Sequence, residues 1–512
     1  MNNRKYDGIY YPVREVTDLK DMIVKSTDLY KEHAAYLQKD KPGGTFQPVT
    51  YGRFREEMEA LGTRLLDLGL QGKKIAVIGE SCYQWILTYF TTVSGVGVIV
   101  PLDKNLPPEE IKNLIKRSGA SALVYTKRSE KSIKDLFKES FDLEYFISIG
   151  EEDHRENVLS MGKLIEEGRK LLREGIRDYV DAEIDPDQMA TLMFTSGTTG
   201  MAKGVMLSHR NIVSNVYNMS KLVHLKEGGI VLSILPIHHA YEMTCSICTT
   251  FYQGKTVAIC EGIKYIQKNM NEAKANYMLG VPLVFEKMYK GMWKQAESRG
   301  EAEKLRRAID LSRRLKLYNN SRLMKKLFKA IHQSFGNNID LFIAGGAAID
   351  PKVIEDFESM GLNMIQGYGM SECSPIIAVN QDRYSKAASV GKPMPGTQVR
   401  IDSPDEDGIG EVVCKSDSVM MGYYDNPEAT AEVLKDGWLY TGDLGYLDED
   451  GFLYLTGRKK TVIVTKGGKN IFPETFYKGL FYSLYQPFTA PATTPSMIYF
   501  WHTRYTMMIG MI

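Results

Sequence analysis

Short apolar runs alternate with amphipathic segments along most of the chain. Residues 73–80 (KKIAVIGE) have the pattern of a buried strand, residues 81–95 that of a helix, and residues 97–103 (GVIVPLD) that of a second strand. A helix with proline at its start and glycine at its end is predicted over residues 107–119, and a third strand over residues 121–126. This strand–helix–strand order predicts a parallel sheet with helices on its faces.

The same unit returns at residues 255–282 and 340–372. After about residue 385 the chain changes to short strands separated by glycine, proline and aspartate turns, which predicts a β-rich subdomain over about residues 385–455. We therefore expect an α/β protein whose large N-terminal domain, residues 1–455, is built of doubly wound, mostly parallel sheets.

The last part of the chain, residues 475–512, differs from everything before it. It contains no aspartate or glutamate and is rich in aromatic residues, threonine and methionine. We interpret this aromatic tail as a frameshifted, misassembled or degenerate end. The alternative is a genuine hydrophobic segment that docks on the core or on a membrane.

The composition excludes several classes of protein. A formal net charge of +1 over 512 residues gives no reason to expect a nucleic-acid partner. Six cysteines in this length do not make a secreted disulfide scaffold, so we expect a cytoplasmic protein. Cys245 and Cys248 form a CxxC in an apolar run with no second pair at zinc-site spacing, which favours core packing. The first residues lack the apolar core of a signal peptide, and no segment makes a convincing membrane span.

One loop carries a clear chemical signal. Residues 194–204 (FTSGTTGMAKG) lie between two strand-like segments and combine glycines, four hydroxyl side chains and Lys203. Glycines let backbone N–H groups approach a bulky anion, while the hydroxyls and the ammonium group supply hydrogen bonds and charge. The pattern is not a Walker A loop, because Ala202 stands where the second glycine is required, and it is not GxGxxG. The loop therefore predicts a polyphosphate ligand.

The segment TSGTTGMAKG resembles the phosphate loop of the adenylate-forming (AMP-binding) enzymes, which include acyl-CoA synthetases, luciferases and peptide-synthetase adenylation domains. Five further segments resemble family motifs and follow in the family's order: PIHHAYE (236–242), FIAGGAAI (342–349), QGYGMSE (366–372), WLYTGDLG (438–445) and LTGRKKTVIVTKGGKNIFP (455–473). The resemblance covers about residues 30–474. It implies that residues 456–474 form a hinge and the start of a small C-terminal domain.

The resemblance implies a role for each residue that matches a motif. ATP phosphates are expected on Thr195, Ser196, Gly197, Thr198, Thr199, Gly200 and Lys203. Adenine is expected against Gly345, Gly346, Ala347, Gly367, Tyr368, Gly369, Met370 and Ser371. Glu372 is the implied ligand of Mg²⁺, Asp443 the acceptor of the ribose hydroxyls, Arg458 a ligand of ribose or phosphate, and Lys460 the hinge residue. With His239 beside the reacting carboxylate, the implied catalytic residues are Thr195, Lys203, His239, Glu372 and Arg458.

Considered without its motif, each of these residues also has a purely structural explanation. Glu372 could be a solvated turn carboxylate, Tyr368 a core aromatic and Asp443 a β-turn residue. Gly345 and its neighbour could serve a tight strand-to-helix turn, and His239 could be a satisfied core histidine.

The segment 291–332 bears on the substrate, because it inserts basic helical sequence between two motifs and in this resembles long-chain fatty acyl-CoA synthetases. Its arginines and lysines interleave with Leu, Ile and Phe, which leads to the hypothesis of peripheral contact with an anionic membrane. The alternative is a solvated charged face over a buried leucine stripe.

The resemblance implies a long-chain fatty acid–CoA ligase. A fatty carboxylate and MgATP would give acyl-AMP and pyrophosphate, and coenzyme A would then displace AMP to form the thioester. The alternatives are transfer to acyl-carrier protein instead of coenzyme A, and a non-catalytic nucleotide or fatty-acid binding protein.

The aromatic tail departs from the family pattern. Its cationic residues, Lys478 and Arg504, do not stand in the PxTxxGK-like context of the family's adenylation lysine. We therefore expect nucleotide binding to be retained and overall ligase activity to be weak or missing.

Overall fold

The computed structural model describes residues 10–137, 143–150, 158–195, 202–459, 463–464 and 470–471. Contacts divide the chain into two units, Met1–Leu455 and Thr456–Ile512. In the second unit, β23 (Ile463–Val464) pairs antiparallel with β24 (Asn470–Ile471). Lys460 and the aromatic tail lie outside the described residues, so the hinge and the interpretation of the tail stay predictions.

The first sheet of the larger unit has eight strands in the order β19-β9-β8-β4-β3-β5-β6-β7. They are β3 (Lys73–Ile78), β4 (Gly97–Leu102), β5 (Ala122–Tyr125), β6 (Tyr145–Ser148), β7 (Val158–Ser160), β8 (Met189–Thr195), β9 (Lys203–Ser208) and β19 (Gly422–Tyr423). The six strands from β8 to β7 are joined in parallel, and β9 and β19 add an antiparallel edge. The helices that accompany this sheet are α2 (Tyr51–Asp67), α3 (Tyr83–Thr91), α4 (Pro108–Ser118) and α6 (Met161–Arg173).

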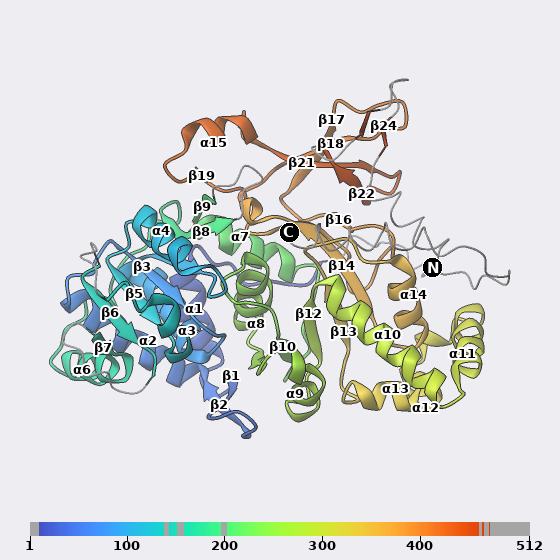
Figure 1. The fold of residues 1–512 in the computed structure, drawn as a ribbon, viewed down its shortest axis with the longest axis horizontal. Coiled ribbons are helices and arrows are strands. Elements are labelled where there is room, and N and C mark those ends of the chain that lie inside the picture. The colour runs from blue at the N-terminus through green and yellow to red at the C-terminus, as the bar shows by residue number, and fades with distance from the viewer. Residues whose placement is uncertain are drawn as a thin grey trace, which may run out of the picture. The chain divides into compact units, whose positions relative to one another are not determined.

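The second sheet has nine strands in the order β16-β15-β14-β13-β12-β10-β11-β1-β2. They are β1 (Ala34–Lys39), β2 (Phe46–Thr50), β10 (Ile230–Ser233), β11 (Thr256–Ile259), β12 (Tyr277–Gly280), β13 (Leu341–Ala344), β14 (Met364–Gly369), β15 (Ile376–Val379) and β16 (Lys392–Pro393). Its central strands, from β14 to β1, are parallel, and antiparallel strands close both edges. The prediction of doubly wound, mostly parallel sheets is confirmed, and Figure 1 shows β3, β5 and β6 of the first sheet in blue and cyan, apart from β10, β12 and β13 of the second sheet in green and yellow.

Between the two sheets lie α1 (Leu19–Leu29), α7 (His209–Ser220), the π-helical turn η3 (Tyr241–Cys248) and α8 (Thr249–Tyr252). The predicted helix over residues 81–95 is α3 continued by a π-helical turn, η1 (Thr92–Val96), in which Gly95 has a φ of +149°. Cys245 and Cys248 are buried in hydrophobic clusters, in agreement with core packing. No helix among the described residues combines the length and the apolar composition that crossing a membrane requires.

The basic insertion is helical, as predicted. It forms α10 (Pro282–Ser298), α11 (Ala302–Arg314), α12 (Ser321–Leu327) and α13 (Lys329–Ser334), which lie together in Figure 1 with α14 (Pro351–Ser359) above them. Buried Asp356 of α14 ties three elements together, because it accepts hydrogen bonds from Tyr289 of α10, from Arg313 of α11 (2.7 Å) and from Lys352 of its own helix (3.1 Å). A buried carboxylate with three donors fixes α10 and α11 against α14.

The third sheet of this unit has five strands and matches the expected β-rich subdomain. It contains β17 (Gln398–Asp402), β18 (Gly410–Lys415), β20 (Leu434–Lys435), β21 (Trp438–Leu447) and β22 (Leu453–Arg458), with α15 (Pro427–Val433) leading into β20. The pairing of β18 with β21 is antiparallel and places Glu411 opposite Leu444 and Gly410 opposite Gly445. Asp443 stands in the middle of β21, where the pairing with β18 has a register irregularity between Glu411 and Val413.

Candidate active site

The ends of the predicted phosphate loop are held by an antiparallel pair. Strands β8 and β9 pair up to Thr195 opposite Lys203, and the hydroxyl of Thr195 lies 3.5 Å from the carbonyl oxygen of Lys203. Both predicted residues thus flank the mouth of the loop. Ser196, Gly197, Thr198, Thr199 and Gly200 lie outside the described residues, and their roles stay predictions.

An arginine that the motifs do not contain holds both sides of this loop. The Nη2 atom of Arg117, in the last turn of α4, donates a 2.8 Å hydrogen bond to the carbonyl oxygen of Ala202. The same guanidinium lies 5.5 Å from the centre of the Phe194 ring. Phe194 belongs to β8 and Ala202 immediately precedes β9, so Arg117 couples the two sides of the loop where the strands separate.

The predicted metal ligand Glu372 meets the phosphate-loop lysine through a tyrosine. The hydroxyl of Tyr423 donates a 2.8 Å hydrogen bond to Oε1 of Glu372, and Nζ of Lys203 lies 4.7 Å from the centre of the Tyr423 ring. Glu372 and Tyr423 are both buried. The sequence analysis did not identify Tyr423 as a site residue. The available signal was the pair of tyrosines in the segment GYYDNPEAT.

Two further motifs meet at a second tyrosine. The hydroxyl of Tyr368, on β14, donates a 2.6 Å hydrogen bond to Oδ2 of Asp443, and both residues are buried. Burial, and then the neighbouring Asp443 carboxylate, raise the pKa of Tyr368 well above its ordinary value, so the phenol keeps its proton. The backbone N–H of Asp443 donates to the hydroxyl of Thr441 (3.1 Å), which fixes the turn that carries the carboxylate.

The glycines of the motifs allow close approach of other groups. A Cβ atom at Gly345 would lie 2.8 Å from the Tyr241 ring, and one at Gly369 would lie 2.0 Å from the carbonyl oxygen of Pro375. Gly346 has a φ of +80°, which favours glycine. These contacts give a structural reason for glycine at these positions. The same glycines line the cavity described next.

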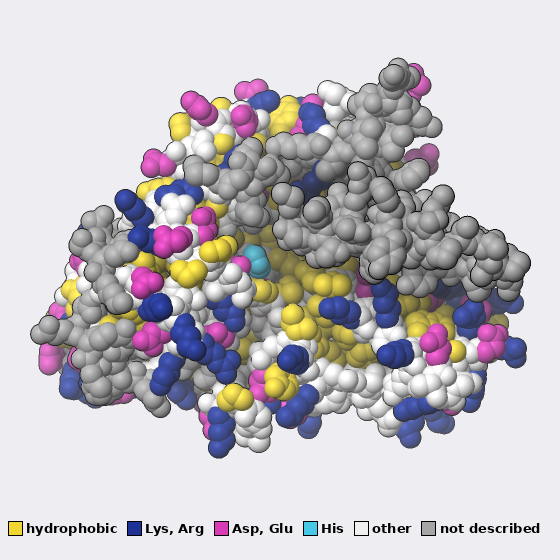
Figure 2. Space-filling view, viewed as in Figure 1, with side chains coloured by type: hydrophobic (Ala, Val, Ile, Leu, Met, Phe, Trp, Pro, Cys, Tyr) yellow, Lys and Arg dark blue, Asp and Glu magenta, His cyan; other side chains and the backbone are white. Residues whose placement is uncertain are grey.

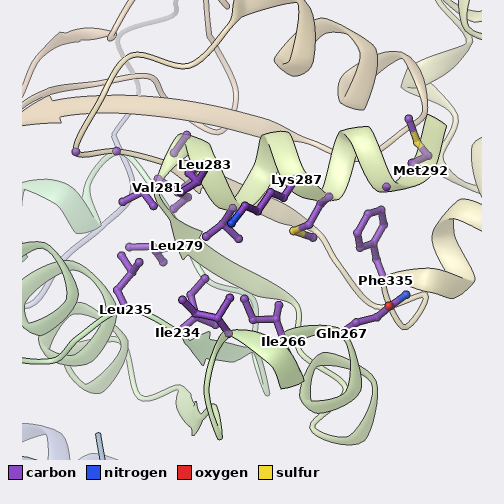
Figure 3. A pocket seen from close by; sticks show the side chains of 18 of the residues that line it. Ile234, Leu235, Ile266, Gln267, Leu279, Val281, Leu283, Lys287, Met292 and Phe335 are labelled. Carbon is purple, nitrogen blue, oxygen red and sulfur yellow. The ribbon is translucent and has the colours of Figure 1, made fainter. Parts of the chain in front are cut away.

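A single cavity of about 1260 Å³ connects these motifs with the basic insertion. Predicted site residues line one end: His239, Gly345, Gly346, Gly367, Gly369, Met370 and Ser371. Its other end is lined by apolar side chains of the helices, among them Met292, Leu305, Ala308, Phe328 and Phe335. Figure 3 shows Ile234, Leu235 and Leu279 facing Leu283 of α10 across this space, and Phe335 below Met292 further along the same helix. The volume exceeds the roughly 300–1,000 Å³ of ordinary small-molecule sites.

Other predicted residues lie away from the lining of the cavity. Lys203, Tyr368, Glu372 and Asp443 form the two contacts described above, and Ala347 is exposed. Arg458 belongs to the second unit, so its role stays a prediction.

The wall of the cavity at His239 carries no charge near pH 7. Burial lowers the pKa of His239 against the opposing effect of Asp103, and burial lowers the pKa of the adjacent His238 to about 4. Behind this wall, burial raises the pKa of Glu242 to about 8, while Ser233 donates a hydrogen bond to its carboxyl group. A neutral imidazole can donate a hydrogen bond to a carboxylate. It forms no ion pair with the carboxylate, and such an ion pair would stabilise the unreacted substrate and so slow its reaction.

A scan against protein families decides the classification. The model of the AMP-binding enzyme family matches residues 25–424, which is most of the chain. The chain belongs to the AMP-binding enzymes. The resemblance inferred from the motifs is therefore confirmed, and the glycine-lined end of the cavity is the end at which family motifs converge.

Named relatives of this AMP-binding enzyme include a long-chain-fatty-acid–CoA ligase, FadD15, of Mycobacterium bovis, which is 29% identical over 447 residues, 84% of this chain and 72% of the relative. A chloroplastic long-chain-fatty-acid–[acyl-carrier-protein] ligase, AEE15, of Arabidopsis thaliana is 28% identical over 502 residues, 83% of this chain and 68% of the relative. The solved structure of a Mycobacterium tuberculosis fatty acyl CoA synthetase has the same fold, with a TM-score of 0.67 at 21% identity over 89% of this chain and 81% of that chain.

Proposed function

We propose that this AMP-binding enzyme activates a long-chain fatty acid with ATP to acyl-AMP and then transfers the acyl group to coenzyme A. The observation that carries the proposal is the continuous cavity from the glycine motifs to the apolar helices. A nucleotide site alone needs no apolar extension of this size, whereas an acyl-adenylate needs both ends. The names of the relatives agree with this substrate.

In the first half-reaction a carboxylate oxygen attacks the α-phosphorus of ATP, an acyl–phosphate bond forms, and pyrophosphate leaves. The reacting groups are all anionic, so positioning and charge screening carry the catalysis. We assign Thr195 and Lys203 to the phosphates, since they stand at the mouth of the loop. His239 lines the cavity and donates to the fatty carboxylate.

The chain fits Mg²⁺ as the ion that neutralises the phosphates. Mg²⁺ in such sites is held by one or two carboxylates together with substrate phosphates and water. The described residues contain no group of three His, Cys, Asp or Glu side chains that could hold a metal alone, and Glu372 offers one fixed, buried carboxylate. We assign Glu372 to Mg²⁺, which screens the phosphate charge when bound.

Acyl-carrier protein is a second candidate acceptor. The chain is similar to the Arabidopsis acyl-carrier-protein ligase over 83% of this chain's length. The two acceptors are separated by supplying each with the same acid and MgATP. Thioester on coenzyme A supports the first proposal, and thioester on carrier protein alone supports the second.

We further propose that the protein works in the cytoplasm and collects fatty acid at an anionic membrane surface. The buried leucine stripe, which was the alternative for the insertion, is incomplete: Leu311 of α11 is 51% exposed, and Leu315, one turn later at the end of the helix, is 61% exposed. Leu283 and Lys287 of α10 line the cavity, and Leu283 is 58% exposed. Figure 2 shows hydrophobic side chains gathered in a hollow with lysine and arginine around it. Apolar anchors among cations suit an anionic bilayer.

Flotation with phosphatidylglycerol vesicles tests the membrane proposal. The wild-type chain should float at low salt and less at high salt, and the double variant L311E/L315E should float less while retaining activity on dispersed acid. Equal flotation of both proteins, or none, would contradict it.

Two assays test the main proposal. Isothermal titration should show binding of MgATP, and labelled pyrophosphate should exchange into ATP only when a long-chain acid is present. Exchange with acetate and long-chain acids alike would contradict the substrate class, and the absence of MgATP binding would contradict the whole proposal.

A further inference from the structure

We infer that Tyr423 is a positioning residue that sets the Glu372 carboxylate and the Lys203 ammonium group at a fixed separation. The inference rests on the proposed function, and it assigns a role to a residue that is in none of the six motif segments quoted above. Its basis is the geometry of one short strand.

Strand β19 is held on two sides. It pairs with β9, placing Gly422 opposite Met206 and Tyr423 opposite Val205. The N–H of Met420 donates to the carbonyl oxygen of Glu372 (2.9 Å), and the N–H of Tyr423 donates to the hydroxyl of Thr430 in α15 (2.9 Å). The backbone on both sides of the tyrosine is therefore fixed to the elements that carry the two charged groups.

The register explains why Tyr423 reaches both of them. Directly opposed residues of an antiparallel pair point to the same face of the sheet, and residues two positions apart on a strand share a face. Lys203 precedes Val205 by two positions, so it is the diagonal neighbour of Tyr423 on that face. Its ammonium group lies 4.7 Å from the ring centre, while the hydroxyl at the far end of the ring bonds Glu372 at 2.8 Å.

Tyr423 thus uses two different parts of one rigid side chain. The ring face attracts the Lys203 cation, and the hydroxyl orients one oxygen of the Glu372 carboxylate. Because the ring is rigid and 7% exposed, its position sets both contacts together. Lys203 is assigned to the phosphates and Glu372 would hold the metal that screens them, so Tyr423 positions both groups relative to each other.

The next residue supplies a matched control. Tyr424 points to the opposite face, where its hydroxyl accepts a 3.2 Å hydrogen bond from Nζ of Lys74. Its N–H donates to the carbonyl oxygen of Gly204 (2.7 Å), a backbone contact that a phenylalanine keeps. Y423F and Y424F therefore each remove one hydroxyl from the same segment, and only the first hydroxyl touches Glu372.

The experiment compares the wild type, Y423F and Y424F by isothermal titration with ATP in the presence and absence of Mg²⁺. A hydrogen bond to a charged group corresponds to about tenfold or more in affinity. Y423F should lose about tenfold in affinity for MgATP and need more Mg²⁺ for half-maximal binding, while its affinity for metal-free ATP stays unchanged because the ring under Lys203 remains. Y424F should match the wild type in each measurement.

A double-mutant cycle with E372Q separates positioning from general loosening of the fold. If Tyr423 acts through Glu372, Y423F should have little further effect in the E372Q background. Equal MgATP affinity of Y423F and Y424F, or a loss in Y423F that does not depend on Mg²⁺, would overturn the inference while leaving the proposed function intact. A wild-type chain that binds no MgATP would instead overturn the proposed function.

Discussion

The hydroxyl of Tyr368 donates a 2.6 Å hydrogen bond to Oδ2 of Asp443, although the two residues are 75 positions apart. One stands on β14 of the nine-stranded sheet and the other on β21 of the β-rich sheet. The residues that the family resemblance assigns to adenine and to ribose are thus a single buried unit. A nucleoside meets a preorganised surface instead of two independent side chains.

This contact predicts the effect of Y368F. The ring remains, but Asp443 loses the donor that orients it, and a hydrogen bond to a charged group contributes about 1.5–3 kcal/mol. Affinity for AMP should fall about tenfold in an isothermal titration, because AMP depends on the ribose contact. Affinity for inorganic tripolyphosphate should not change, and an equal loss for both ligands would show that the tyrosine acts on the fold in general.

The contacts of Arg117 predict that α4 anchors the two sides of the phosphate loop. R117M keeps most of the apolar stem and removes the bond to the Ala202 carbonyl and the charge over Phe194. We expect weaker ATP binding and faster cleavage of the loop by a protease, with a loss of about 1 kcal/mol in the free energy of unfolding. R128M, at an exposed arginine, is the control. Identical behaviour of the two variants would exclude the anchoring role.

Glu242 predicts a pH dependence of stability. Its pKa is about 8 in the folded protein against an ordinary value of 4.5, because burial disfavours the charge. The neighbouring Tyr241, Cys245 and Cys260 also have raised pKa values, so they stay neutral in this range. The folded state therefore holds a proton that the unfolded state releases, and stability falls as the pH rises from about 4.5 to about 8.

The variant E242Q removes this titration while keeping an oxygen for Ser233 to bond. Its free energy of unfolding, measured by chemical denaturation, should gain on that of the wild type by a margin that grows between pH 5 and pH 8 and is then constant, with a slope of at most about 1.4 kcal/mol per pH unit. The lowered pKa values of His238 and His239 affect both proteins alike, so they cancel in the difference. A margin independent of pH would contradict the assignment.

The apolar end of the cavity predicts a limit on chain length. Ala308 of α11 lines this end, and A308F would fill part of it. Acid-dependent pyrophosphate exchange, measured over a series of fatty acids, should shift toward shorter acids with little change for the shortest. Substitution of Ala302, which is on the same helix and outside the lining, should leave the profile unchanged. A uniform loss for all acids would place Ala308 outside the acyl site.

The sequence predicted what depends on local pattern. Strand β3 and helix α4 lie within two residues of the predicted ranges, because apolar runs, the first-turn proline and the C-terminal glycine act on neighbouring residues. Gly346, whose φ is +80°, is also explained by its local backbone. By contrast, Arg117 and Tyr423 reach the loop and Glu372 from segments that are distant in sequence, and a single sequence carries no signal for such contacts.

The sequence could not show which leucines of α11 are exposed, for a related reason. A period of 3.6 residues shows that one face of a helix is apolar, but the surface that covers this face depends on the packing of the whole unit. Ile309 and Ser312 point inward, while Leu311 and Leu315 remain outside.

The most direct test of the central claim, that one cavity receives both the nucleotide and the acyl chain, is binding of non-hydrolysable acyl-AMP mimics of increasing chain length. Each CH₂ buried in the cavity should raise the affinity about fourfold, since it contributes about 0.8 kcal/mol, until the chain reaches the apolar end. Affinity that does not change with chain length, or no binding of any mimic by the folded protein, would contradict the account.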